Sequence, residues 1–286
     1  MNTPVSAPPA AEPGPPPPTV AEALAWARRA LAAGASKDEA ALEARMLLAR
    51  PEASIGMHAW DRLRGWVARR RAGEPMAYLL GSWGFWDLEL AMTPAVLVPR
   101  PETEALVELA LELLGPGPAT VAEVGTGSGA VALALARERP AWRLIATDLC
   151  PEALAVAREN RDALGLAARV ELRLGETCTP LAGERLDLLL ANPPYVAEGD
   201  PCLKALRHEP RLALVAGPTG LELIERIARQ ARALLRPGGW LLLEHGAGQG
   251  EAVATLLQDL GYRTVLERRD LAGRPRAAAG RWEGAG

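Results

Sequence analysis

The sequence has few residues of the kinds that build disulfide frameworks or metal centres. Its three cysteines, Cys150, Cys178 and Cys202, contain no C-x-x-C pair, which argues against a zinc site and against a disulfide-stapled fold. The three histidines also lack metal-ligand spacing, so we expect no metal. No apolar run approaches the roughly 18 residues that a membrane span needs. These absences predict a soluble, cytoplasmic protein that does not contact a membrane.

An excess of positive charge is also missing. The 32 Lys and Arg residues are outnumbered by 35 Asp and Glu residues, which gives a net charge of −3. A protein that depends on the electrostatics of nucleic acid is therefore not expected. Hydrophobic residues make up 49% of the chain and charged residues 23%, close to globular averages. A length of 286 residues favours two domains.

The amino-terminal part of the chain changes character at Thr19. Residues 1–18 hold eight of the 25 prolines and almost no large apolar side chain, so we predict a disordered tail there. Residues 19–81 are predicted to form a small helical domain, because Thr19-x-x-Glu22 and Ser36-x-x-Glu39 are both capping boxes. A third helix is expected from about Ala59 to Gly73.

A linker and an alternating α/β region follow. Residues 82–99 contain two strand-like runs around Thr93-Pro94, which predict a β-hairpin. Residues 100–286 open with a helix from Pro101 to Leu114 and then alternate apolar strands with helices. This pattern predicts a Rossmann-like α/β domain with a mainly parallel sheet and helices on both faces. The strands are expected at residues 120–124, 143–147, 169–174, 186–191, 240–244, 262–266 and, more weakly, 276–282.

Open parallel sheets bind ligands at the carboxyl ends of their strands, and a glycine-rich turn follows the first of these strands. It contains Gly125, Thr126, Gly127, Ser128 and Gly129. Alternate glycines let a ligand lie against bare main chain. The spacing G-x-G-x-G after an acidic residue is typical of S-adenosylmethionine sites, whereas a dinucleotide fingerprint would require glycine where Ala130 stands.

Acidic residues end the next two strands. Asp148 is placed to accept hydrogen bonds from both hydroxyls of a ribose; the alternative is a helix N-cap, and both roles are compatible. Glu176 could accept from an adenine amine, although a solvated loop carboxylate explains it equally well.

The fourth strand ends in Asn192-Pro193-Pro194-Tyr195. Because proline has no N–H group, the turn leaves carbonyl groups without a competing donor. The Asn192 amide oxygen and the Pro193 carbonyl could together accept both hydrogens of a planar NH₂ group. Tyr195 could offer a flat face to the same group. The alternative, a plain strand-terminating turn, does not require Asn and Tyr beside the prolines.

Further motifs add to this pattern, and together the chain resembles the release factor glutamine methyltransferase family of class I S-adenosylmethionine-dependent methyltransferases. The likeness extends from about Glu74 to Trp282. The motifs are Glu74-Pro75-Met76-Ala77-Tyr78-Leu79-Leu80-Gly81, Val98-Pro99-Arg100-Pro101-Glu102-Thr103-Glu104, Glu209-Pro210-Arg211-Leu212-Ala213-Leu214 and Leu243-Glu244-His245-Gly246.

The resemblance implies methylation of the Gln side-chain amide nitrogen in the Gly-Gly-Gln loop of class 1 peptide chain release factors. It assigns Gly125–Gly129 and Asp148 to the cofactor, and Asn192 to both cofactor and substrate. After the third strand the family pattern has Asp, where this chain has Glu176 followed by Thr177; Glu176 is kept as a cofactor residue because of its place at the strand end. Pro193, Pro194 and Tyr195 would complete the glutamine pocket, so Asn192, Pro193 and Tyr195 are the expected catalytic residues. The helical domain would dock the substrate, and we expect a monomer that binds no nucleic acid.

Three rival functions share parts of the pattern. A glutamine methyltransferase of a ribosomal protein would use the same Asn-Pro-Pro-Tyr pocket, but Arg100–Glu104 favours the release factor branch. An adenine-amine methyltransferase of DNA or RNA should carry a basic groove, which an acidic chain does not provide. A non-catalytic cofactor-binding protein would not need both Asn192 and Tyr195.

Overall fold

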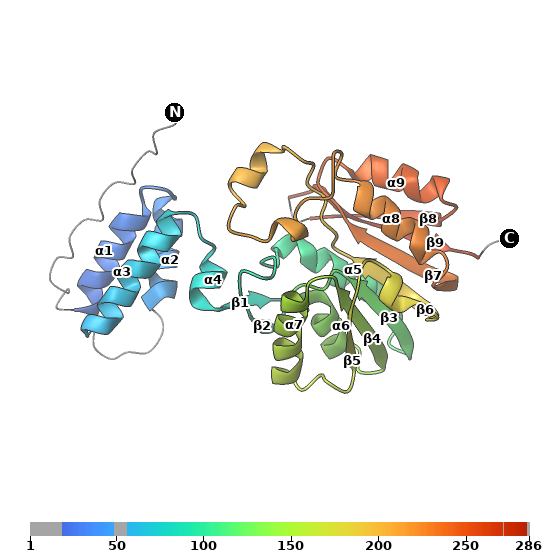
Figure 1. The fold of residues 1–286 in the computed structure, drawn as a ribbon, viewed down its shortest axis with the longest axis horizontal. Coiled ribbons are helices and arrows are strands. Elements are labelled where there is room, and N and C mark those ends of the chain that lie inside the picture. Colours follow the sequence, from blue (N-terminus) through green and yellow to red (C-terminus); the bar gives the residue numbers. More distant parts are fainter. Residues whose placement is uncertain (1–18, 49–55, 271, 285–286) are drawn as a thin grey trace, which may run out of the picture. The chain divides into compact units, whose positions relative to one another are not determined.

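The computed structural model describes residues 19–48, 56–270 and 272–284. The chain divides into two compact units, Met1–Leu79 and Leu80–Gly286, which Figure 1 colours along the sequence. The predicted disordered tail, residues 1–18, lies outside the described residues. The division falls two residues before the Gly81 boundary that the sequence suggests.

The first unit is helical. The Thr19 hydroxyl accepts from the Glu22 N–H at 3.2 Å, and the Glu22 carboxylate accepts from the Thr19 N–H at 3.1 Å. The first capping box is therefore confirmed, since each side chain satisfies a backbone donor. Trp26 and Trp60 pack edge to face, with ring centroids 4.7 Å apart. The helices are α1 (Val20–Leu31), α2 (Lys37–Leu48), α3 (Met57–Arg71) and α4 (Met76–Leu80).

The second unit opens with a hairpin whose position differs from the prediction. Strands β1 (Ser82–Phe85) and β2 (Leu88–Ala91) are antiparallel and turn at Trp86-Asp87. The predicted hairpin around Thr93-Pro94 is wrong, and Ala95–Val98 lies in a turn followed by irregular backbone.

The reason lies in contacts that are distant in the sequence. Trp86 adopts a φ of 56°, a left-handed conformation that a bulky residue rarely takes. Its backbone N–H donates to Glu104 at 2.9 Å, and its indole N–H donates to Glu138 at 2.9 Å. These two bonds stabilise a turn that the local sequence does not indicate.

The described part of the second unit contains a seven-stranded sheet in the order β5-β4-β3-β6-β7-β9-β8. The first five strands of this order are parallel, while β9 runs antiparallel to both β7 and β8. The predicted mainly parallel α/β fold is confirmed. The strands are β3 (Ala119–Val124), β4 (Trp142–Asp148), β5 (Val170–Leu174), β6 (Leu186–Ala191), β7 (Leu235–Glu244), β8 (Arg263–Arg269) and β9 (Pro275–Trp282).

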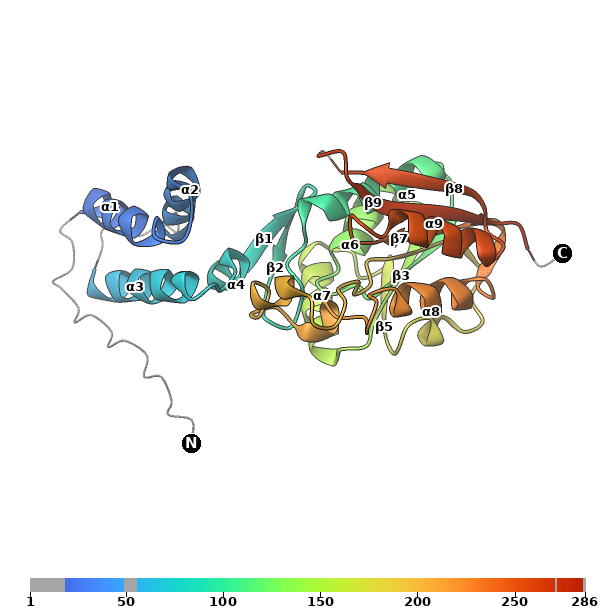
Figure 2. The same ribbon diagram turned by 90° about the horizontal axis from the view of Figure 1, so that it is seen from above.

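Helices lie on both faces of this sheet, as Figures 1 and 2 show. The helix predicted from Pro101 to Leu114 begins as a 3-10 turn, with Pro101 in the first turn, where its missing N–H group costs no helical hydrogen bond. The helices are η1 (Pro101–Thr103), α5 (Glu104–Leu113), α6 (Ala130–Glu138), α7 (Pro151–Ala163), η2 (Thr179–Leu181), η3 (Pro201–Lys204), η4 (Arg211–Ala213), α8 (Glu222–Ala231) and α9 (Gly250–Asp259).

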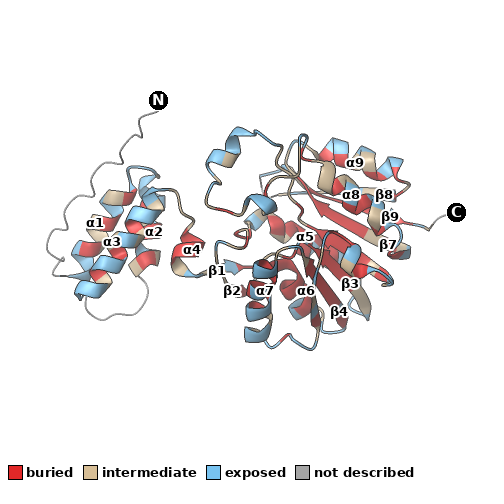
Figure 3. Ribbon diagram, in the orientation of Figure 1, coloured by how far each residue is buried: buried red, intermediate tan, exposed pale blue. Residues whose placement is uncertain are grey.

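The middle strands are apolar on both faces, which is why they read as continuous hydrophobic runs. Leu188, Leu189 and Leu190 are fully buried in succession, and Figure 3 shows the centre of the sheet in red. Strand β8 differs from the middle strands. It lies at the edge, and its charged, largely exposed sequence Arg263–Arg269 discourages pairing with another chain.

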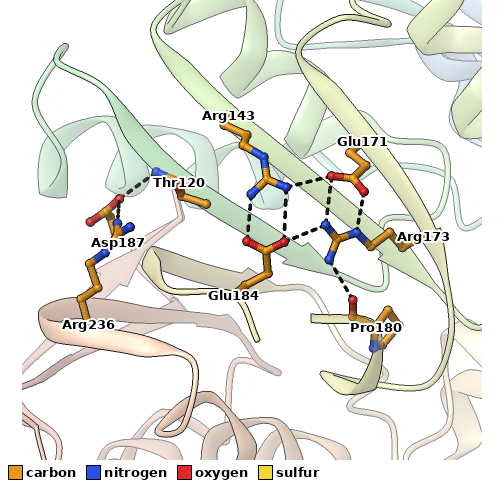
Figure 4. A network of polar contacts seen from close by, with 8 residues as sticks. All are labelled: Thr120, Arg143, Glu171, Arg173, Pro180, Glu184, Asp187 and Arg236. Carbon is orange, nitrogen blue, oxygen red and sulfur yellow. Dashed lines mark hydrogen bonds and ion pairs between the residues drawn. The ribbon is translucent and has the colours of Figure 1, made fainter. Parts of the chain in front are cut away.

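A network of charges joins neighbouring strands of the sheet (Figure 4). Arg143 on β4 and Arg173 on β5 share the carboxylates of Glu171 and Glu184, at 2.7–2.9 Å. Because two guanidinium groups surround it, the pKa of Glu184 falls to about 2. A second contact joins Asp187 of β6 to Arg236 of β7 and to the Thr120 N–H of β3. These contacts connect adjacent strands. Arg143, Glu171 and Asp187 lie near the amino ends of their strands, whereas Arg173 is the penultimate residue of β5.

Candidate functional site

Strand register brings three of the predicted site residues to one place. Val124, the last residue of β3, pairs with Thr147 of β4 on one side and with Ala191 of β6 on the other. The chain therefore leaves the sheet at Gly125, Asp148 and Asn192 from three adjacent strands. This is the point where strand order reverses direction, the usual location of a ligand in an open α/β sheet.

A cavity of about 540 Å³ opens at these strand ends. Its volume lies within the range of small-molecule sites. Of the predicted cofactor and substrate residues, all but two lie in its wall: Gly125, Thr126, Gly127, Ser128, Asp148, Glu176, Asn192, Pro193 and Pro194. Gly129 follows directly at the start of α6, and Tyr195 follows Pro194.

The glycine-rich turn has a backbone that only glycine adopts without strain. Gly125, Gly127 and Gly129 have φ angles of 74°, 56° and 86°, all in the left-handed region. A Cβ on Gly129 would also lie 2.9 Å from a methyl carbon of Leu133. The spacing G-x-G-x-G is thus required by the path of the chain, which brings main chain rather than side chains to the cavity.

Both Asp148 carboxylate oxygens accept backbone hydrogen bonds. Oδ2 accepts from the Gly127 N–H at 2.8 Å, and Oδ1 accepts from the Cys150 N–H at 2.9 Å. Asp148 therefore stabilises the glycine turn through one carboxylate oxygen and the beginning of the loop to α7 through the other. Each oxygen has a second lone pair, so these bonds leave capacity for the ribose hydroxyls that the sequence suggests. Burial raises the pKa of Asp148.

Glu123 is a cavity residue that the sequence interpretation used only as the acidic start of the glycine motif. It is 2% exposed, accepts from the Thr126 hydroxyl at 2.6 Å and accepts from the Ala132 N–H at 3.0 Å. Burial raises its pKa to about 7, and the Asp148 charge adds to the rise. Its place as the penultimate residue of a buried strand, directly before a ligand loop, could have identified it.

Glu176 lines the cavity, but its carboxylate pairs with Arg226 of α8. This contact lowers the pKa of Glu176 and engages the group that was expected to meet adenine. The neighbouring Thr177 has a φ of 49° and a buried hydroxyl without a hydrogen-bond partner among the described residues. The backbone of this turn is therefore held in an uncommon conformation at the cavity wall.

The Asn-Pro-Pro-Tyr turn presents different groups in different directions. Asn192, Pro193 and Pro194 line the cavity, and the Asn192 side-chain NH₂ donates to the Thr103 hydroxyl at 3.3 Å. The Tyr195 ring packs against the core beneath, and its hydroxyl donates to Glu244 at 3.3 Å. Burial raises the pKa of Tyr195 and raises that of Glu244 to about 7.

Two of the motifs that carry the family resemblance meet beside this turn. Arg100 and Glu209, 109 residues apart, form an ion pair. Glu209 also accepts from the Val98 N–H at 3.2 Å. Val96, Leu97 and Pro99 line the cavity, and so do Pro210 and Leu212. The Arg100–Glu209 pair therefore joins two segments of its wall.

In the described ranges, no group of three or more His, Cys, Asp or Glu side chains is placed to hold a metal ion. His245 is fully buried, and burial lowers its pKa. Within residues 19–48, 56–270 and 272–284, no helix has the length and hydropathy of a membrane span.

Comparison with known proteins agrees with the geometry. A family model described as "Methyltransferase small domain" matches residues 103–209. A release factor glutamine methyltransferase of Pseudomonas aeruginosa is 48% identical over 234 residues, which cover 81% of this chain and 84% of that protein. One from Moorella thermoacetica is 46% identical over 274 residues, with 90% and 96% covered.

The fold has relatives among solved structures as well. A methyltransferase from Pyrococcus furiosus superposes with a TM-score of 0.53 at 19% identity and covers 78% of this chain and 98% of that one. At that identity the likeness concerns the fold alone.

Proposed function

Because this chain belongs to the release factor glutamine methyltransferase family, we propose that its cavity is where a release factor glutamine receives a methyl group. The chain is an S-adenosylmethionine-dependent methyltransferase that acts on release factors. We assign the acceptor as the side-chain amide nitrogen of the Gln in the Gly-Gly-Gln loop of class 1 factors.

One observation carries the assignment of the site. Gly125, Asp148 and Asn192 leave three adjacent strands side by side and all line one cavity. The turn that we propose binds the donor and the side chain that we propose accepts from a planar NH₂ group therefore line the same cavity. This is the proximity that a direct methyl transfer requires.

The residues of the cavity fit the methyl donor. Main chain at Gly125–Gly129 would lie against it, and Asp148 would accept from its ribose hydroxyls. Glu123 would place a carboxylate near its positive charges. When bound, S-adenosylmethionine supplies an electrophilic methyl group on a sulfonium centre.

The turn after β6 would orient the acceptor. An amide nitrogen is a poor nucleophile because its lone pair is delocalised into the carbonyl. If the Asn192 Oδ1 atom and the Pro193 carbonyl each accept one hydrogen of the NH₂ group, charge development on the nitrogen is favoured. The same two bonds fix the direction of its lone pair. Such orientation contributes up to about 7–11 kcal/mol in favourable cases.

The partner is proposed to be a protein, bound by a single copy of the enzyme. The net charge of −3 supports a protein substrate over a nucleic acid. Light scattering of the purified enzyme, alone and with release factor, measures how many copies of the enzyme associate and whether the release factor binds.

Labelled S-adenosylmethionine tests the function directly. The enzyme is incubated with a class 1 release factor, with the same factor carrying Gln→Ala in its Gly-Gly-Gln loop, with ribosomal proteins and with DNA. We expect label only in the unmodified release factor. Label that persists after Gln→Ala, or that appears in another substrate instead, would overturn the assignment.

A further inference from the structure

Asn160 of α7 has a buried amide whose hydrogen-bond partners lie in two other parts of the fold. The residue is 3% exposed. Its Oδ1 atom accepts from the Ala91 N–H of β2 at 2.6 Å, and its Nδ2 atom donates to the Ala91 carbonyl at 3.2 Å and to the Ser128 carbonyl at 2.9 Å. Both N–H groups of the amide are therefore used. A buried amide without partners is costly, so these three bonds explain why a polar side chain is stable at this position.

The bonds to Ala91 attach the amide to the hairpin in one orientation. Strand β2 pairs with β1, and the Asn160 amide bonds to both backbone polar groups of Ala91, the last residue of β2. Buried backbone groups need such partners. Rotation of the amide by half a turn would place its NH₂ group against the Ala91 N–H and its oxygen against two carbonyl oxygens. The hairpin therefore determines that the NH₂ group is the part of Asn160 that meets Ser128.

The Ser128 carbonyl belongs to the glycine turn, and Ser128 lines the cavity. The Gly129 N–H, in the same peptide group as that carbonyl, donates to the Thr126 carbonyl at 2.8 Å. The turn also packs directly on α7, because a Cβ on Gly129 would lie 3.5 Å from the Cβ of Ala157. Ala157 precedes Asn160 by about one helical turn, so the two residues share a face of α7. The Ser128–Gly129 peptide is thus held by a hydrogen bond at each of its polar groups.

We propose that Asn160 is a positioning residue of the methyl donor site, which fixes the Ser128–Gly129 peptide of the glycine turn to the β1–β2 hairpin. This role rests on the proposed assignment of the turn to the donor. Glycine-rich main chain has unusual conformational freedom, and a site that is already ordered loses less entropy when it binds. Without the Asn160 amide, the Ser128 carbonyl would lose its partner and the peptide would be free to rotate. The hairpin thereby acquires a role in donor binding.

Calorimetry on the full-length enzyme tests this role. In Asn160→Ala we expect the Kd for S-adenosylmethionine to rise by about 10-fold, with the KM for release factor within about twofold of wild type. Asn160→Leu, which fills a similar volume without polar atoms, should behave in the same way.

Trp142→Phe is the matched control for a general loss of stability. It also removes a hydrogen bond from a buried side chain to a backbone carbonyl, that of Gly115 at 3.2 Å. Trp142 begins β4, at the end opposite to Asp148. Denaturant titrations measure the stability of each variant, and the control should bind the donor as wild type does. A donor Kd in Asn160→Ala within about twofold of wild type, or an equal rise in Trp142→Phe, would overturn the proposal.

A single NMR signal reports on the hydrogen bond itself. Ser128-Gly129 is the only Ser-Gly pair in the sequence. Protein made by cell-free synthesis with carbonyl-¹³C serine and ¹⁵N glycine therefore gives one cross-peak for this peptide group. That cross-peak should move in Asn160→Ala and in Asn160→Leu and stay in place in Trp142→Phe. An unmoved cross-peak in both Asn160 variants would overturn the proposal.

The same cross-peak separates this role from the proposed function. Titration of wild type with S-adenosylmethionine should move it, because the turn is proposed to hold the donor. A cross-peak that does not respond to the donor would overturn the donor site and the role of Asn160 together. A response to the donor without label in release factor would refute the proposed substrate alone, and the affinities of the Asn160 variants would still decide the positioning role.

Discussion

At the scale of single residues, Asn192 is the most sensitive test of the site, because it lines the cavity at the end of β6. Asn192→Ala should lower the methyl-transfer rate by about 10²–10³ while cofactor affinity changes far less. Asn192→Asp keeps the acceptor but adds negative charge, which should strengthen binding of a cationic donor and oppose its loss of charge during transfer. Single-turnover rates and calorimetric affinities of both variants are the measurement. A rate near that of wild type in Asn192→Ala would mean that the Asn-Pro-Pro-Tyr turn has only a structural role.

Asp148 should matter for the cofactor. Asp148→Asn replaces an oxygen that now accepts a backbone N–H, and it removes the charge that strengthens hydrogen bonds from ribose hydroxyls. We expect a loss of about 1–3 kcal/mol in the binding free energy of S-adenosylmethionine. Asp162→Asn, on the exposed face of α7, is the control and should bind normally. Equal affinities in the two variants would leave Asp148 with only its structural bonds.

The raised pKa of Glu123 predicts how the affinity for the cofactor depends on pH. Its pKa is about 7 because it is buried, and a bound cation favours the ionised form, so binding lowers that pKa and releases a proton. Affinity should therefore rise with pH up to about 7 and level off above it. Calorimetry near pH 6 in buffers of different ionisation enthalpy counts the protons. In Glu123→Gln the release and the rise should both shrink, and proton uptake by wild type would contradict the argument.

At the scale of elements, the charge network between the strands predicts a stability effect. Glu184→Gln leaves Arg143 and Arg173 without the carboxylate they share, and should lower the free energy of unfolding by about 1 kcal/mol. Glu184 has a pKa of about 2 when folded, below its ordinary value of 4.5. Its contribution is therefore complete above pH 4.5 and disappears as the pH falls toward 2.

Denaturant titrations at several pH values measure this contribution. The difference between wild type and Glu184→Gln should be largest at neutral pH and close to zero near pH 2. Glu283→Gln, which removes an exposed partner of Arg281, should change stability by only a few tenths of a kcal/mol. A Glu184→Gln difference that is independent of pH would exclude the ion pairs as its source.

The elements also show what a sequence can and cannot predict. The alternation of apolar strands and helices is a local pattern, and so is the glycine spacing that a left-handed turn demands, so both were predictable. The Trp86 turn was not, because its positive φ is stabilised by Glu104 and Glu138, which lie far along the chain. Likewise, the pairing of Arg100 with Glu209 depends on strand order, which no local pattern encodes.

At the scale of the whole molecule, the residues that line the cavity all lie at or beyond Ala95, inside the second compact unit. A chain that begins at Leu80 should therefore bind S-adenosylmethionine with nearly wild-type affinity. It should methylate intact release factor far more slowly, since we assign docking to the helical unit. Calorimetry and label transfer measure the two properties. Equal methylation rates for the short and full chains would show that the helices have another role.

The order of strands in the sheet also affects how the protein folds during its synthesis. β3 is translated long before β6, yet the two are neighbours in the finished sheet, so the glycine turn lacks one wall until Asn192 has been made. Non-local pairings of this kind close slowly. The donor site that we propose is therefore complete only after β6 has left the ribosome. The sheet is complete only when β9 lies between β7 and β8.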